Sequence, residues 1–253
     1  MNTVRLRNVE VGVGKPKVIV PIVAATKEEI LAKADSLRGL VFDVVEWRVD
    51  FYRDVLDTDQ VLDTLAGLRA SLGETPILFT FRTKKEGGER EISMEQYTAL
   101  NEAAARSGHV DAVDVEIFSG DEVVAANLRN IHGAGVAVVG SSHEFGYTPT
   151  QEELVARLCK QQEMGCDILK VAVMPQCRRD VLTLLSATEE MYTQHARQPI
   201  VTMSMAGTGV LSRLCGEVFG SAMTFGAVGQ VSAPGQVQVE QLNTVLQILH
   251  DAM

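Results

Sequence analysis

Short runs of β-branched residues alternate regularly with longer segments of helical pattern from about residue 17 onward. This alternation is typical of a parallel sheet whose strands are joined by crossover helices. Helical patterns cover, among others, residues 27–37, 94–107, 150–163 and 179–192. The predicted strands are 17–23, 41–48, 76–82, 110–117, 135–141, 167–173, 199–205 and 223–228.

Eight strand and helix units within the roughly 235 residues after residue 16 match a (β/α)8 TIM barrel in both length and count. A doubly wound open sheet more often stops at about five or six strands. Residues 1–16 precede the first unit and predict a small hairpin that caps one end of the barrel. The sequence therefore predicts an α/β fold in which residues 1–253 form a single TIM-barrel domain.

Composition narrows the class of protein. Hydrophobic residues make up 46% of the chain and charged residues 22%, as in ordinary globular proteins. The longest apolar stretches fall far short of the roughly 18 residues that a membrane span needs. The amino terminus alternates in polarity, unlike the apolar core of a secretory signal. We therefore expect no association with a membrane.

The four cysteines and the net charge indicate where the protein works and which partners it can bind. Cys159, Cys166, Cys177 and Cys215 form no Cys-x-x-Cys pair, so neither a disulfide framework nor a zinc site is expected. A reducing cytoplasm is the natural location. The net charge of −10, without a basic cluster, argues against nucleic acid as a partner. A small anionic substrate stays possible, because local cations in a cleft can outweigh a diffuse surface charge.

Alternation along the strands predicts which side chains enter the barrel. Successive side chains on a strand point to opposite faces, and helices cover the apolar face. Val45 and Trp47 oppose Glu46 and Arg48, and the later strands repeat this division. We therefore expect the polar set to face inward near the carboxyl ends of the strands, where barrel active sites lie. That inward set is Glu46, Arg48, Thr80, Arg82, Asp114, Glu116, Ser141, His143 and Lys170.

Lys170 is the most informative member of this set. It stands in an apolar run, 168–174, where desolvation disfavours the ammonium and a nearby cation would disfavour it further. The resulting free amine can attack a carbonyl carbon and form an imine. A lysine that merely reaches solvent at a strand end is the alternative. An inward position on the sixth barrel strand favours the nucleophile.

The ionisable residues expected near Lys170 can have either a catalytic or a structural role. His143 follows the fifth predicted strand and is either a catalytic acid and base or a hydrogen-bonded barrel histidine. Glu46, Asp114 and Glu116 either contact substrate or neutralise the inward cations, since buried charges are costly without partners.

These residues resemble type I 3-dehydroquinate dehydratase, the Schiff-base enzyme of the shikimate pathway. Each matching sequence stretch is a weak signal by itself, but the whole set in this order along the chain is specific for the family. Three positions differ from the usual pattern, namely Pro21 on the first strand and Ser142 and Glu144 beside the histidine. The matching stretches are Glu46-Trp47-Arg48, Phe79-Thr80-Phe81-Arg82, Lys85-Glu86-Gly87-Gly88-Glu89, Asp114-Val115-Glu116-Ile117, Ser141-Ser142-His143, Lys170-Val171-Ala172-Val173-Met174-Pro175, Met203-Ser204-Met205, Ser212-Arg213 and Ser232-Ala233-Pro234-Gly235-Gln236.

The resemblance implies dehydration of 3-dehydroquinate to 3-dehydroshikimate by a homodimer, without metal or other cofactor. Lys170 would form the imine, His143 would move the protons, and Glu86 would fix the orientation of His143. Arg213 would bind the substrate carboxylate. The segment 226–238 would form a lid that delivers Ser232 and Gln236. The full set of expected substrate contacts is Glu46, Trp47, Arg48, Arg82, Arg213, Ser232, Gln236, Met203, Met205 and Phe225.

Two other functions stay open at this stage. The first is a lysine-dependent aldolase acting on a phosphorylated sugar, with phosphate bound by the glycine-containing loops at 207–209 and 226–230. The second is a barrel that binds a metabolite without converting it. Turnover of 3-dehydroquinate would distinguish the dehydratase from both.

Overall fold

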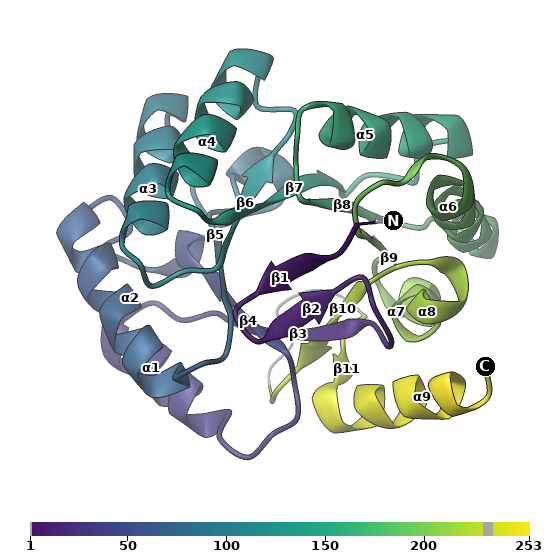
Figure 1. The fold of residues 1–253 in the computed structure, drawn as a ribbon, viewed down its shortest axis with the longest axis horizontal. Helices are drawn as coiled ribbons and strands as arrows, with labels where there is room; N and C mark the ends of the chain where they lie inside the picture. Colours follow the sequence, from purple (N-terminus) through teal and green to yellow (C-terminus); the bar gives the residue numbers. More distant parts are fainter. Residues whose placement is uncertain (1, 230–234) are drawn as a thin grey trace.

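The computed structural model describes residues 2–229 and 235–253. Parallel strands alternate with helices around a barrel, which Figure 1 shows end-on with the helices outside. The fold predicted from the sequence is confirmed. The barrel strands are β3 (Lys17–Ile22), β4 (Val44–Arg48), β5 (Ile77–Thr80), β6 (Ala112–Glu116), β7 (Ala137–Glu144), β8 (Ile168–Val173), β9 (Ile200–Ser204) and β10 (Met223–Ala227), with the short β11 (Val237–Gln238) beside β10.

The strands follow one another in chain order from β3 to β9, and β10 pairs with β3. Between β9 and β10 the contact is made by the residues just before β10. The Ala222 N–H donates to the Ile200 carbonyl at 2.7 Å, and the Ser221 hydroxyl accepts from the Thr202 N–H at 3.1 Å. These bonds close the sheet on itself and remove its free edges.

The helices cover the outer face of the barrel. Several begin with the sequence pattern of a capping box, in which a Ser or Thr and a Glu or Gln three residues later bond reciprocally to the backbone. Thr26 with Glu29, Ser93 with Gln96 and Thr150 with Glu153 form such boxes. The helices are α1 (Lys27–Ser36), α2 (Thr58–Leu72), α3 (Met94–Arg106), α4 (Asp121–Gly133), α5 (Gln151–Glu163), α6 (Arg178–Glu190), α7 (Val210–Leu214), α8 (Gly216–Phe219) and α9 (Val239–Asp251).

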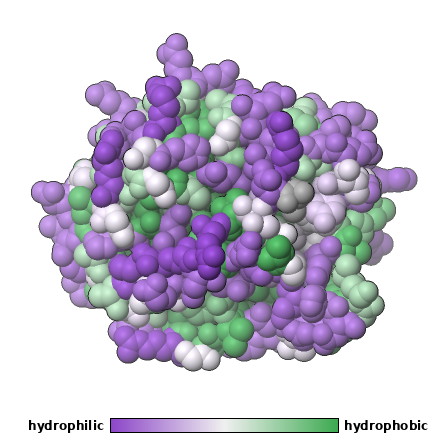
Figure 2. Space-filling view, in the orientation of Figure 1, coloured by the Kyte–Doolittle hydropathy of each residue, from purple (hydrophilic) through white to green (hydrophobic). Residues whose placement is uncertain are grey.

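The amino-terminal hairpin consists of β1 (Val4–Leu6) and β2 (Val9–Val11). It crosses the open end of the barrel in Figure 1. Leu6 and Val11 are buried against apolar lumen residues, whereas Arg5 and Glu10 face solvent. The same end of the molecule is largely hydrophilic on its outer surface (Figure 2). The hairpin is therefore a plug that is apolar inside and polar outside, and the predicted hairpin at residues 1–16 is confirmed.

Several predicted boundaries differ from the structure. The fourth strand begins at Val44 rather than at Val41, which is 74% exposed. The seventh extends to Glu144, so His143 lies on a strand and not just beyond one. Helix α6 ends at Glu190 and continues as a π-helical turn over Met191–His195. In the described part of the chain, none of the helices has the length and apolarity needed to cross a bilayer.

Candidate active site

A cavity of about 210 Å³ opens at the carboxyl ends of the barrel strands. Its walls differ in polarity. Strands β4, β7 and β8 and the loop after β5 contribute charged lining residues, which we call the charged wall together with the acids of β6 that pair with them. Strands β9 and β10 contribute an apolar wall. The lining residues are Glu46, Arg48, Phe51, Arg82, Glu86, Gly87, His143, Phe145, Lys170, Ala172, Met203, Met205, Arg213, Phe225 and Gln236.

Lys170 lies in the middle of β8 and is only 4% exposed. Its Nζ lies 3.0 Å from Asp114 Oδ2 and 3.8 Å from Glu46 Oε1. The ammonium also sits over the Phe225 ring, 4.9 Å from its centroid. The carboxylate of Asp114 bridges Lys170 and the guanidinium of Arg82. Lys170 is thus held by two acids on one side and an aromatic face on the other.

Arg82 binds most of the carboxylates in the charged wall. Its Nη2 lies 2.8 Å from Asp114 Oδ1, and its Nη1 lies 2.9 Å from Glu116 Oε1 and 3.7 Å from Glu86 Oε2. The Ser141 hydroxyl accepts from Arg82 at 3.0 Å and donates to Asp114 at 2.6 Å. Such dense pairing offsets the cost of burying these charges. The Arg82 guanidinium is therefore engaged by three carboxylates at once.

Asp114 and Glu116 fit the neutralising role left open by the sequence. Glu116 also accepts from the N–H of Thr83 at 2.8 Å and from its hydroxyl at 2.7 Å. Burial of Asp114 opposes ionisation, but the charges of Arg82 and Lys170 outweigh it and lower the pKa of this carboxyl below its ordinary value. Asp114 therefore stays ionised and keeps its hold on Lys170.

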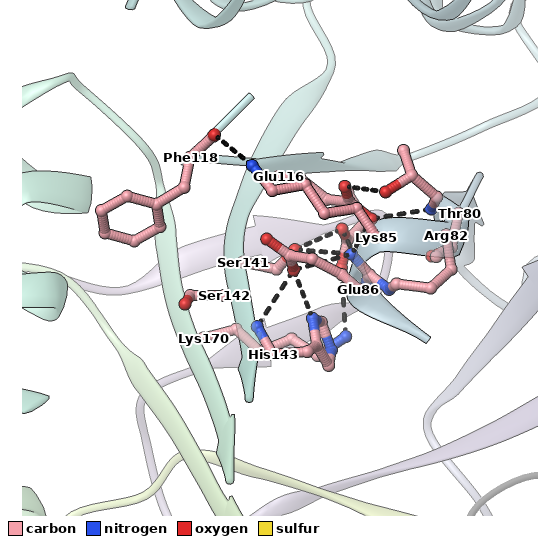
Figure 3. A network of polar contacts seen from close by, with 12 residues as sticks. Thr80, Arg82, Lys85, Glu86, Glu116, Phe118, Ser141, Ser142, His143 and Lys170 are labelled. Atoms are coloured by element: carbon pink, nitrogen blue, oxygen red, sulfur yellow. Dashed lines mark hydrogen bonds and ion pairs between the residues drawn. The ribbon is translucent and has the colours of Figure 1, made fainter. Parts of the chain in front are cut away.

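His143 and Glu86 form the second feature of the charged wall. The His143 Nδ1 lies 2.9 Å from Glu86 Oε2, and the same oxygen accepts the His143 backbone N–H at 3.0 Å. Figure 3 shows these two contacts converging on Glu86, close to Arg82. With the Nδ1 proton directed at Glu86, the Nε2 of the ring carries the free lone pair. The glutamate thus fixes both ring orientation and tautomer.

The protonation of this pair follows from its surroundings. Burial, followed by the positive charges of Arg82 and Lys170, lowers the pKa of His143 well below its ordinary value. Burial and the nearby Glu116 raise the pKa of Glu86 to about 8, against the opposing effect of Arg82. Both shifts favour uncharged partners. A neutral imidazole in a cavity beside a lysine is suited to accept a proton.

The loop after β5 places Glu86 by close backbone packing. A Cβ on Gly88 would lie 1.9 Å from the carbonyl oxygen of Arg82, a distance that only glycine allows. Gly87 has a φ of 82° and faces the ring of Phe145. The Gly87-Gly88 pair therefore turns the chain so that Glu86 returns toward His143.

Arg213 and Arg48 are the further cations of the cavity. Arg213, on α7, is 2% exposed, and its Nη1 lies 3.8 Å from the Met203 sulfur. Burial lowers the pKa of this guanidinium to about 10, so it stays charged at neutral pH. Arg48 makes a bidentate pair with Asp50 at 2.8 and 2.9 Å. Both guanidinium groups line the cavity, so an anionic ligand would meet positive groups there.

Most of the expected site residues share the cavity, with two exceptions. Trp47 is fully buried on the outer side of β4, where it packs on Phe79 and Tyr52. The prediction that Trp47 contacts substrate is wrong. Its side chain alternates with those of Glu46 and Arg48 and therefore points away from the lumen, toward the helices. Ser232 lies outside the described residues.

Four lining residues were absent from the predicted contacts, namely Phe51, Gly87, Phe145 and Ala172. A signal existed for one of them. Ala172 stands two positions after Lys170 on the same strand, so alternation directs it inward. Phe145 follows the end of β7 and has no such signal. Phe51 lies in a 3-10 turn and Gly87 in a loop, where strand alternation gives no direction.

Carboxylates and a histidine, which are common metal ligands, occur in the site. Within residues 2–229 and 235–253, no group of three or more His, Cys, Asp or Glu side chains could hold a metal ion. All four cysteines are free.

Comparison with known proteins places this geometry in one family. The family model described as type I 3-dehydroquinase matches residues 18–253. A 3-dehydroquinate dehydratase from Salmonella agona is 52% identical over 252 residues, covering 100% of both chains. The one from Clostridioides difficile is 48% identical over 250 residues, or 99% of this chain and 98% of its own. A crystal structure of type I 3-dehydroquinate dehydratase from Clostridium difficile with covalent modified comenic acid has a TM-score of 0.98 at 48% identity, covering 100% of this chain and 99% of that one.

Proposed function

This chain belongs to the type I 3-dehydroquinase family, and we propose that it dehydrates 3-dehydroquinate to 3-dehydroshikimate through a covalent imine on Lys170. Its activity is that of a 3-dehydroquinate dehydratase, a lyase of the shikimate pathway. One observation carries the mechanism. A buried lysine and a neutral, oriented histidine line the same cavity from adjacent strands.

The first stage joins enzyme and substrate. Lys170 first releases one proton, and its amine then adds to the ring ketone. That proton returns to the hydroxyl group of the adduct, which leaves as water, so a protonated imine remains. Asp114 and Glu46 face the positive nitrogen of Lys170 before the reaction and stabilise the same charge afterwards. The apolar wall of Met203, Met205 and Phe225 excludes water around this nitrogen.

The second stage removes the hydroxyl. The iminium withdraws electrons, so His143 Nε2 can take the proton from the adjacent ring carbon and leave an enamine. The enamine then expels the hydroxyl group, to which the imidazolium returns its proton as water departs. Hydrolysis of the product imine frees Lys170, and the net change is loss of one water. Glu86 accepts a hydrogen bond from Nδ1 of the imidazolium while it exists.

Substrate binding follows from the cations and the polar wall. Arg213 presents a planar, charged group that can grip a carboxylate through two hydrogen bonds. Arg48, Glu46 and Gln236 line the remaining polar surface and are placed to meet ring hydroxyls. Arg82 contributes through the acids it holds.

We further propose that the enzyme works as a homodimer in the cytoplasm. Sedimentation of the purified chain would test the dimer, and cell fractionation would test the location.

Borohydride trapping tests the chemistry directly. The protein is incubated with 3-dehydroquinate, reduced with borohydride and digested for mass spectrometry. We expect one adduct, on the peptide that contains Lys170. An adduct on another lysine, or turnover without any adduct, would overturn the proposed mechanism. Turnover of a phosphorylated sugar in place of 3-dehydroquinate would favour the aldolase.

A further inference from the structure

The chain adopts a rare backbone conformation where β9 ends. Ala206 has φ 56° and ψ 177°, a combination that residues with a side chain seldom adopt. It follows Met205, which lines the cavity, and precedes the 3-10 turn that leads into α7 and Arg213. The conformation fixes the direction of the Ala206 carbonyl.

Gly235 packs directly against this carbonyl. A Cβ on Gly235 would lie 2.2 Å from the Ala206 oxygen and 2.6 Å from its carbonyl carbon. These are backbone atoms, so they cannot swing aside as a flexible side chain can. Gly235 also has φ 78°, which by itself favours glycine. Two independent constraints therefore require glycine at position 235.

The contact controls where the next residue lies. Gln236 lines the cavity, and the two residues after it form β11, which pairs with Gly226 and Ala227 of β10. The Gln238 side chain accepts from the Gly229 N–H at 3.2 Å and donates to the Gly229 carbonyl at 3.1 Å. Gln236 is thus held between a close packing contact on one side and a short strand on the other.

We propose that Ala206 and Gly235 form a seat that positions Gln236 in the cavity, which makes Gly235 a positioning residue for substrate binding. The seat connects the exit of β9 to the segment before α9, and the neighbouring residues Met205 and Gln236 both line the cavity. The effect on substrate rests on the proposed function, while the seat itself is a property of the backbone.

Gly235→Ala tests the seat, and Gly108→Ala is its matched control. Gly108 has φ 73° and no heavy atom within 4 Å of an added Cβ, so it carries the same backbone strain without a close neighbour. We expect Gly235→Ala to raise the KM for 3-dehydroquinate by about two- to tenfold, the range that loss of one hydrogen bond typically gives. Borohydride trapping on Lys170 should persist. Gly108→Ala should leave the KM at its wild-type value. A wild-type KM in Gly235→Ala as well would overturn the proposal.

A double-mutant cycle separates positioning from a general structural role. If Gly235 acts through Gln236, the double variant Gly235→Ala with Gln236→Ala should have the same KM as Gln236→Ala alone. Fully additive effects would show that the glycine acts by another route and would refute the proposal.

Hydrogen exchange tests the seat without any substrate. The amides of Val237 and Gln238 should exchange faster in Gly235→Ala than in the wild type, and at the wild-type rate in Gly108→Ala. If the amides of Val237 and Gln238 exchange at the wild-type rate in Gly235→Ala, the seat does not hold this segment and the proposal is refuted. If the wild type fails to convert 3-dehydroquinate, the proposed function fails, and this measurement still decides the seat.

Discussion

The two ends of the barrel lumen are built from the same strands but perform different tasks. On strands β4 to β8, the inward residue nearer the hairpin is apolar and the inward residue two positions later is polar. Position along a strand therefore decides whether an inward side chain supports the fold or the chemistry. The pairs are Val44 and Glu46, Leu78 and Thr80, Ala112 and Asp114, Val139 and Ser141, and Ile168 and Lys170.

The difference follows from how each end is closed. At the amino end, Leu6 and Val11 of the hairpin seal the lumen, so polar groups there would lose their hydration without gaining partners. At the carboxyl end, the inward groups meet one another. Arg82 alone contacts three carboxylates, and each of these has further partners. Substitutions at the two ends should therefore separate loss of activity from loss of stability.

Lys170→Ala should give the largest effect on activity. Turnover of 3-dehydroquinate should fall by at least about a thousandfold, because the covalent route is lost. The borohydride adduct should disappear from the mass spectrum. Lys160→Ala is the control, since that lysine pairs with Asp121 outside the barrel. A persistent adduct in Lys170→Ala would place the nucleophile elsewhere.

His143→Ala should give the next largest effect. Imine formation needs only the amine, so the adduct should still accumulate, while turnover should fall by at least about a hundredfold as proton removal slows. Steady-state kinetics and trapping on the same sample would check both. His132→Ala, at an exposed histidine paired with Asp167, should behave as the wild type. Near-normal turnover in His143→Ala would assign the base to another group.

Leu6→Ala addresses the opposite end of the lumen. Leu6 is 2% exposed and packs against the apolar layer. Its truncation should lower the free energy of unfolding by about 2–4 kcal/mol, as for other buried leucines. The kcat of the folded enzyme should stay within about twofold of the wild type, because the kinetics depend on the other end. Urea unfolding and kinetics together would measure both, and a large fall in kcat would contradict the division between the ends.

Glu86→Gln tests the charged end of the lumen through the pH dependence of protein stability. The pKa of Glu86 is about 8 in the folded protein, against 4.5 ordinarily, so the folded state binds the extra proton between these values. The contribution of protonated Glu86 to the free energy of unfolding is fully present below about pH 4.5 and is lost as pH rises toward 8. Glutamine does not titrate, so the stability of the wild type relative to Glu86→Gln should fall by at least about 1 kcal/mol over this range. Exposed Glu89→Gln provides the control. Parallel curves for wild type and Glu86→Gln would show that Glu86 ionises normally.

Much of the site could be predicted because alternation along a strand is a local property. The period of two directs Glu46, Asp114, Ser141 and Lys170 into the lumen without any knowledge of their neighbours. The same rule places Trp47 among the helices, so its proposed contact with substrate ran against the pattern of its own strand. The order of elements likewise predicted the barrel, since eight alternating units admit few other closed arrangements.

The sequence by itself determined the barrel, the inward set and the candidate nucleophile and base. Only the tertiary structure decided which charges pair, because partners such as Arg82 and Glu116, or Glu86 and His143, come from strands and loops far apart in the chain. Their separations depend on register and barrel closure, which no local pattern encodes. The approach of Gly235 to the Ala206 carbonyl has the same origin, since a close contact between distant backbones exists only once both segments are folded.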